Sequence, residues 1–176
     1  MIFVENIRIE QIKSMEENVN ELSELLVQVV DDGASIGFLP PMQLSVANKY
    51  WRNVLNRDVV LFVAKINNQI AGSIQLHLCM KPSGMHRAEI AKLMTAPNYR
   101  RIGVARALMK AAEKRAREEG RSLLVLDTRE GDPSNILYTS LAYIQAGKIP
   151  YYAKSANGQF DSTIIYYKSF HSNNLS

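Results

Sequence analysis

The chain has 176 residues and a formal net charge of +4 at pH 7, with 47% hydrophobic and 22% charged residues. These values are those of an ordinary globular protein that is long enough to bury a core. The positive residues do not form one long run, which disfavours a nucleic-acid-binding domain.

Other classes of protein are disfavoured by particular residues. One cysteine, Cys79, allows neither an intramolecular disulfide nor a CxxC metal pair, and no cluster has metal-ligand spacing. A nucleophile pair with His77 would need a third, orienting group, so we interpret Cys79 as a packing residue. No apolar run of about 18 residues would span a membrane. Charges at Glu5, Arg8 and Glu10 interrupt the N-terminal apolar residues, so we expect no signal peptide and a cytoplasmic protein.

The first half of the chain shows strand and helix patterns in turn. Rough alternation over residues 2–12 predicts a strand. Ser14 is a candidate cap for a helix that runs to about Val30, because apolar residues recur there at helical spacing. The elements expected next are a loop over 31–41, a helix over 42–55, a strand over 59–66, a turn over 67–69, a strand over 70–80 and a turn over 81–86.

The second half begins with a strand over 88–95, which Pro97 ends because proline has no N–H to donate. From Arg101 onward, apolar residues at 105, 108, 109, 112 and 116 predict a helix. The elements expected after it are a strand over 121–127, a loop over 128–133, a helix over 134–142, and strands over 144–152 and 163–170 joined by a turn at Asn157-Gly158. The order β-α-α-β-β-β-α-β-α-β-β contains no linker, so we expect one mixed α/β domain over residues 1–176.

The turn that leads into the middle helix has the features of an anion site. Residues 90–112 contain five basic residues and no acidic one. Gly103 and Ala105 keep the backbone bare, and unpaired N–H groups at a helix start carry partial positive charge that suits a phosphate. The nucleotide motifs GxxxxGK[ST] and GxGxxG do not occur. An ordinary surface turn with solvated arginines is the alternative.

Arg100, Gly103 and Ala105 match the Q/R-x-x-G-x-G/A signature of the GNAT acetyltransferases, and Leu93 and Pro97 stand where that family usually has them. The stretch therefore resembles a GNAT coenzyme loop. The resemblance implies the GNAT fold, with a mixed, mostly antiparallel sheet of six to seven strands, about four helices and splayed central strands. It also implies acetyl-CoA as the cosubstrate, without a metal. The implied coenzyme-binding residues are Leu93, Met94, Thr95, Arg100, Arg101, Ile102, Gly103, Val104, Ala105 and Arg106.

Tyr138 is the candidate hydrogen-bond donor to the departing thiolate. Its segment SNILYTSLAY resembles the family's L-Y-x-x-x-G-[FY] helix, with Ala142 in place of the usual glycine. A phenol with a pKa of ~10 is a weaker acid than a thiol near 8.5, so complete proton transfer is uphill by ~2 kcal/mol. A hydrogen bond to the sulfur or a lowered pKa of Tyr138 would close that gap. The alternative is a core tyrosine.

Two carboxylates compete for the role of base, which must deprotonate an amine that is almost fully protonated at pH 7. Glu89 lies on the strand before the loop, at an offset from Arg100 where some GNAT enzymes carry a catalytic glutamate. Asp127 ends the next strand, where the slot between the splayed strands would open, and apolar neighbours can raise the pKa of a carboxyl. A salt bridge for Glu89 and a cap for Asp127 are the alternatives. The two carboxylates can also divide the task, one binding the amine and the other taking its proton.

Further segments resemble the tabtoxin-resistance acetyltransferases within that family. The similar segments are GASIGF at 33–38, KPSGMHRAE at 81–89, KLM at 92–94, LDT at 126–128 and LAYIQAGKIPYY at 141–152. In that subgroup an aspartate and a tyrosine are the proposed catalytic pair, and the matching positions are Asp127 and Tyr138. Where many GNAT enzymes carry a CoA-contacting asparagine, this chain has Gly131, so that contact is missing or supplied otherwise.

The resemblance predicts an acetyl-CoA-dependent N-acetyltransferase in which the primary amine of a small molecule, such as an amino-acid-like toxin or antibiotic, attacks directly. The loop over 31–41 and the turn over 81–86 are the expected walls of the acceptor site. Transfer to a protein N-terminus or lysine is one alternative, and a CoA-binding regulatory domain without turnover is another. We expect neither nucleic acid nor membrane as a partner, and the tyrosine-rich last strands are candidates for the edge of a homodimer.

Overall fold

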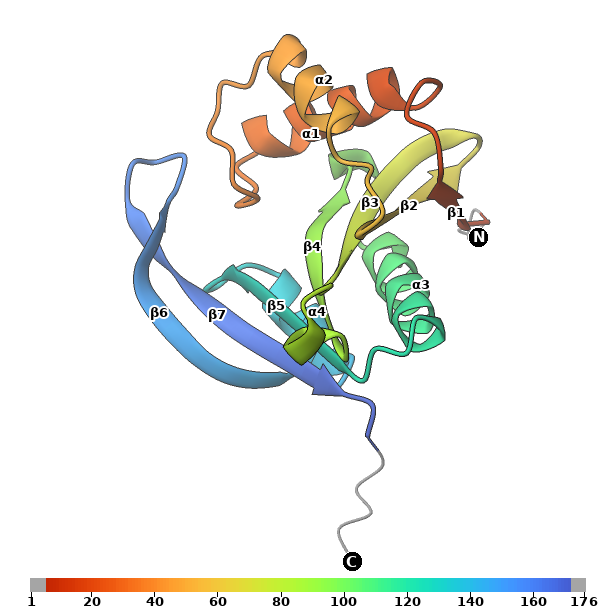
Figure 1. Cartoon of the computed structure of the whole chain (residues 1–176). Helices are drawn as coiled ribbons and strands as arrows, with labels where there is room; N and C mark the ends of the chain where they lie inside the picture. Colours follow the sequence, from red (N-terminus) through yellow and green to blue (C-terminus); the bar gives the residue numbers. More distant parts are fainter. Residues whose placement is uncertain (1–5, 172–176) are drawn as a thin grey trace, which may run out of the picture.

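A seven-stranded sheet in the order β1-β2-β3-β4-β5-β7-β6 forms the centre of the computed structural model, which describes residues 6–171 (Figure 1). The strands are β1 (Arg8–Ile12), β2 (Val59–Ile66), β3 (Gln69–Leu78), β4 (Arg87–Thr95), β5 (Leu123–Arg129), β6 (Ile144–Lys154) and β7 (Phe160–Ser169). The helices are α1 (Val19–Asp31), α2 (Leu44–Arg52), α3 (Val104–Glu118) and α4 (Ser134–Ser140), with short 3₁₀ turns η1 (Pro82–Gly84) and η2 (Pro97–Tyr99). Neighbouring strands are antiparallel except for β4 and β5, which are parallel. The predicted mixed, mostly antiparallel sheet with four helices is confirmed.

The two faces of the sheet carry two separate cores. On β2, Leu61 and Val63 point toward α1 and α2, whereas Val60 points toward α3, because successive side chains of a strand alternate between faces. Trp51 of α2 is fully buried on the first face, and Leu108 of α3 is fully buried on the second. Helix α4 belongs to the α3 side of the sheet, because its Tyr138 packs in the same core as Leu108 of α3. The sheet is thus the middle of three layers.

The central strands β4 and β5 part soon after they meet, which confirms the splay. Among the described residues their ladder pairs only Arg87–Glu89 with Leu123–Val125, although β4 continues to Thr95. The opposite edge of β4 contains a bulge against β3, and Lys92 lies there with a φ of 53°. This irregularity turns β4 away from β5, and Figure 1 shows the two strands diverging.

Helices α1 and α3 begin later than the sequence suggested. Helix α1 starts at Val19 rather than near Ser14, whose backbone oxygen instead accepts a hydrogen bond from the Asn18 side chain. Helix α3 starts at Val104 rather than Arg101, because Arg101 and Gly103 have φ angles of 62° and 96°. These left-handed conformations are incompatible with an α-helix.

Other boundaries shift for local reasons as well. Helix α4 ends at Ser140 rather than Ala142, which has a φ of 65°. Helix α2 is shorter than the predicted span of 42–55, and β7 begins at Phe160, three residues before the predicted start at Thr163. The first predicted strand shrinks to β1, and its residues 2–5 lie outside the described part of the chain.

Strand β3 lies close to β4 and α3 at Gly72. A Cβ atom at Gly72 would lie 2.5 Å from the backbone oxygen of Met94 and 2.9 Å from a methyl group of Val104. Because Val104 is the first residue of α3, this contact sets where the helix begins relative to the sheet.

We predict that Gly72→Ala lowers the free energy of unfolding by about 1–3 kcal/mol, because the added methyl group overpacks a site bounded partly by backbone. Urea unfolding followed by circular dichroism measures this. Gly147→Ala is the matched control, since a Cβ there meets nothing within 4 Å. An equal effect of the two substitutions would contradict the prediction.

Candidate active site

A cavity of about 920 Å³ opens where β4 and β5 diverge. Its walls are the loop after α1 (residues 32–37), β4, the turn into α3, the end of β5 with the following loop, α4, and the tips of β6 and β7. The predicted acceptor loop therefore forms a wall. The turn over 81–86 does not line this cavity, because it precedes β4 and so lies at the other end of that strand.

The turn into α3, which the sequence predicts to be the coenzyme turn, forms one end of the cavity. The predicted coenzyme residues that line it are Leu93, Thr95, Arg100, Arg101, Gly103, Val104, Ala105 and Arg106. The first N–H groups of α3 lack partners within the helix, and the helix has 15 residues. Its N-cap is Gly103, whose φ of 96° suits glycine. Basic side chains and unpaired N–H groups thus meet at one place.

The two other predicted coenzyme residues lie away from the cavity wall. The Met94 side chain is 3% exposed and packs in the core under α1 and α2. Ile102 is 45% exposed and does not line the cavity. A part for either residue would therefore involve its main chain, and both stay predictions.

Tyr138 is both a core residue and a cavity residue. It is 5% exposed, and its ring packs against those of Tyr143 and Tyr166 at centroid distances of 5.9 and 5.8 Å. Burial, followed by the negative charge of Asp127, raises the pKa of Tyr138 well above its ordinary value. The alternative of a lowered tyrosine pKa is therefore wrong. The phenol stays protonated and can act as a hydrogen-bond donor.

The two candidate carboxylates lie on one face of the sheet. Glu89 pairs with Val125, and Asp127 follows two residues later, so their side chains point to the same side. Both side chains are exposed and line the cavity. The hydroxyl of Thr163 donates to Oδ2 of Asp127 at 2.7 Å and fixes that carboxylate.

Lys92 is a site residue that the sequence did not single out. Its ammonium donates to the backbone oxygen of Ile36 and lies 5.5 Å from the centre of the Phe38 ring. A Cβ at Gly37 would come within 3.0 Å of the Lys92 nitrogen, so the bare backbone there makes room for it. Lys92 thereby anchors the acceptor loop to β4. Its sequence signals were its place in the basic stretch and in the KLM segment at 92–94.

Electrostatics connect Lys92 with both carboxylates. Burial lowers the pKa of Lys92, while the negative charges of Asp127 and Glu89 oppose that shift. The side of the cavity beside the loop over 32–37 therefore contains two carboxylates and one ammonium that influence one another.

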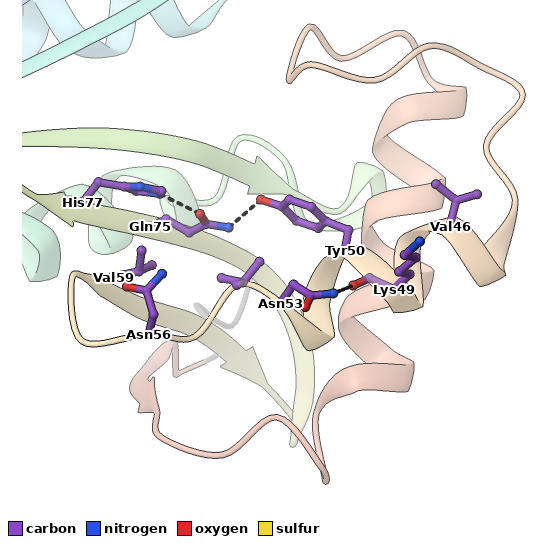
Figure 2. A pocket seen from close by; sticks show the side chains of 9 residues that line it. Val46, Lys49, Tyr50, Asn53, Asn56, Val59, Gln75 and His77 are labelled. Atoms are coloured by element: carbon purple, nitrogen blue, oxygen red, sulfur yellow. Dashed lines mark hydrogen bonds between the residues drawn. The ribbon is translucent and has the colours of Figure 1, made fainter.

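A second hollow of about 500 Å³ lies between α2 and strands β2 and β3 (Figure 2). The amide of Gln75 donates to the hydroxyl of Tyr50 at 2.9 Å, and its oxygen lies 2.8 Å from Nε2 of His77. An amide oxygen only accepts, so Nε2 of His77 holds a proton. The sulfur of Cys79 instead accepts from Arg87 at 3.7 Å. His77 and Cys79 have different partners, which agrees with the packing interpretation of Cys79.

Within residues 6–171, no group of three or more His, Cys, Asp or Glu side chains is arranged to hold a metal ion. None of the helices in this part of the chain has the length and apolar character needed to cross a membrane.

A sheet that splits beside a basic helix start agrees with the class of acyltransferases that take their acyl group from coenzyme A. Residues 24–143 match the acetyltransferase (GNAT) family, and the chain belongs to this family. It is an acyltransferase, and acetyl-CoA is its cosubstrate. An "uncharacterized N-acetyltransferase in hisH-hisA intergenic region" of Azospirillum brasilense is 33% identical over 119 residues, which is 64% of this chain and 69% of the relative.

Solved structures share the fold at low sequence identity. A Staphylococcus aureus N-acetyltransferase has a TM-score of 0.81 at 15% identity, covering 94% of this chain and 99% of the other. A Brucella melitensis ribosomal-protein-alanine N-acetyltransferase has a TM-score of 0.78 at 18% identity, covering 93% and 99%. A Salmonella typhimurium structure, described as an acetyltransferase with its cofactor acetyl-CoA, has a TM-score of 0.79 at 14% identity, covering 97% and 98%.

We predict that the imidazole of His77 titrates below its ordinary pKa of 6.5, because burial disfavours its charged form. Glu89→Gln lowers this pKa further, whereas Lys92→Met raises it, since Glu89 favours and Lys92 disfavours the imidazolium. NMR titration of the ring protons measures both shifts, with the His77→Gln spectrum as the assignment control. Shifts of the same sign in the two variants would contradict this electrostatic account.

Proposed function

We propose that this acetyltransferase transfers the acetyl group of acetyl-CoA to the primary amine of a small molecule by direct attack. The observation that carries the proposal is the single cavity that contains the coenzyme turn, Tyr138, Asp127 and Glu89. Walls from the loop over 32–37 and from the tips of β6 and β7 bound its acceptor side. A bounded cavity of this kind favours a small acceptor over an extended protein segment.

The chain's own residues fit the coenzyme. Acetyl-CoA supplies an acetyl group that is activated as a thioester. Arg100, Arg101 and Arg106, with the N–H groups that begin α3, would hold its diphosphate. The edge of β4 over 93–95, which β5 leaves unpaired, would bind the pantetheine arm. An added Cβ at Gly103 would meet nothing within 4 Å, so the backbone there is open to a ligand.

The reaction needs a base for the amine and a hydrogen-bond donor for the thiolate, and three side chains serve these two roles. About one alkylamine in a few thousand is unprotonated at pH 7, so a base must take a proton from the ammonium. We assign this task to Asp127, which Thr163 fixes in place and whose charge acts on the nearby Tyr138. Glu89 would hold the ammonium from the other side. Tyr138 would donate a hydrogen bond to the departing thiolate while keeping its own proton.

Thiol release from acetyl-CoA across a panel of amines and peptides tests the proposal. Turnover with small amines and none with peptides supports it. Turnover with peptides alone would favour a protein N-terminus or lysine as the acceptor, and tight CoA binding without any turnover would favour a regulatory domain. The tabtoxin-resistance subgroup, the single domain over 1–176, the cytoplasmic location and the homodimer stay predictions.

We predict that Tyr138→Phe lowers kcat by about 10²-fold while the Kd for CoA stays the same, because only the donor to the leaving sulfur is lost. Steady-state kinetics and calorimetry measure the two quantities. Tyr143→Phe is the matched control, since Tyr143 is also a buried tyrosine of the same cluster but does not line the cavity. An unchanged kcat in Tyr138→Phe would remove this role.

We predict that Gly103→Ala raises the Kd for CoA about tenfold, because alanine at a φ of 96° is strained by ~1–2 kcal/mol and the turn must shift. Calorimetry with CoA measures the change. Gly120→Ala is the control, since Gly120 has a φ of 69° just beyond the other end of α3. Equal weakening of CoA binding by both substitutions would mean that the turn has no special part.

A further inference from the structure

Arg129, the last residue of β5, contacts three separate segments with one guanidinium group. Its Nε and Nη2 atoms lie 3.0 and 2.9 Å from Oδ1 of Asp132. Its Nη1 donates to the hydroxyl of Ser155 at 3.1 Å, and its Nη2 donates to the backbone oxygen of Gly33 at 3.1 Å. The side chain is 22% exposed. We call this set of contacts the Arg129 clamp.

Each contact of the clamp belongs to a different wall of the cavity. Gly33 lies in the acceptor loop after α1, more than 90 residues from Arg129 along the chain. Ser155 follows β6, is 7% exposed and donates to Asp161, which also lines the cavity. Asp132 lies in the loop that leads to α4, the helix that presents Tyr138. The clamp therefore joins the walls that face the acceptor.

The geometry of the clamp requires an arginine. A guanidinium donates in several fixed directions, whereas the ammonium of a lysine donates from one point. The positive charge is matched by the carboxylate of Asp132, and the remaining donors are directed at Ser155 and Gly33. Arg129 is thus occupied by the protein itself and is not left free to bind an anionic acceptor.

We propose that Arg129 is a positioning residue that holds the acceptor side of the cavity in its binding shape. This role depends on the proposed function in one respect, namely that the acceptor is a small amine. The Arg129 contacts lie outside the turn over 101–106, where Arg106 donates to the hydroxyl of Ser140 at 2.7 Å. Loss of the clamp therefore weakens binding of the amine without weakening binding of acetyl-CoA.

Arg129→Lys and Arg129→Gln test the proposal by hydrogen–deuterium exchange of the full chain. We expect faster exchange of the amides over 33–37 and 155–161 and unchanged exchange over 101–106. With an amine that the wild-type enzyme acetylates, KM for the amine rises at least tenfold and KM for acetyl-CoA stays within twofold. Millimolar guanidinium ion partly restores the low amine KM in Arg129→Ala. Arg115→Lys is the control, because Arg115 binds Gln11 of β1 and Glu119, the residue just after α3.

Unchanged exchange over 33–37 and 155–161 would overturn the proposal, as would equal rises in both KM values with faster exchange throughout the chain. If the wild-type enzyme acetylates no small amine, the proposed function fails, and the exchange pattern alone then decides whether the clamp positions the walls. The two failures are therefore distinguishable.

Discussion

The parting of β4 from β5 after the Glu89–Val125 pair is the constraint on which the rest of the site depends. If β4 and β5 continued their parallel ladder, hydrogen bonds between the two strands would fill the space that the cavity occupies. The bulge against β3, with Lys92 at a φ of 53°, ends that pairing early. The same irregularity leaves a β4 edge for a ligand, opens the cavity and directs the Lys92 side chain toward the acceptor loop.

Basic side chains from three segments hold that loop against the rest of the fold. Arg100 of the coenzyme turn forms an ion pair with Asp32, Arg129 of β5 binds the backbone oxygen of Gly33, and Lys92 of β4 binds that of Ile36. The exposed Arg100–Asp32 ion pair contributes little stability, about 0–1 kcal/mol. The three contacts matter for geometry, because together they fix the position of one cavity wall relative to the split sheet.

The sequence predicted the elements and the coenzyme turn because both depend on local patterns. Hydrophobic periodicity predicted the middle helix. The signature from Arg100 to Ala105 predicted the coenzyme residues, most of which line one cavity. It did not predict the partners of Lys92 and Arg129, which lie 56 and 96 residues away along the chain. The predicted start of α3 at Arg101 was also wrong. Arg101 has a left-handed φ, and an arginine in a sequence does not indicate that conformation. The environment of Tyr138 depends on burial by distant strands, so the direction of its pKa shift was open.

The burial of Tyr138 affects how the activity of the enzyme depends on pH in alkaline solution. Its burial and the neighbouring aspartate keep the ring hydroxyl neutral beyond the range in which alkylamines, with a pKa of ~10.4, lose their proton. An activity curve recorded across that range therefore reports on the substrate amine, while the aromatic hydroxyl remains a constant background. Tyr138, one of the eight tyrosines, therefore takes no part in acid–base chemistry and acts as a fixed dipole.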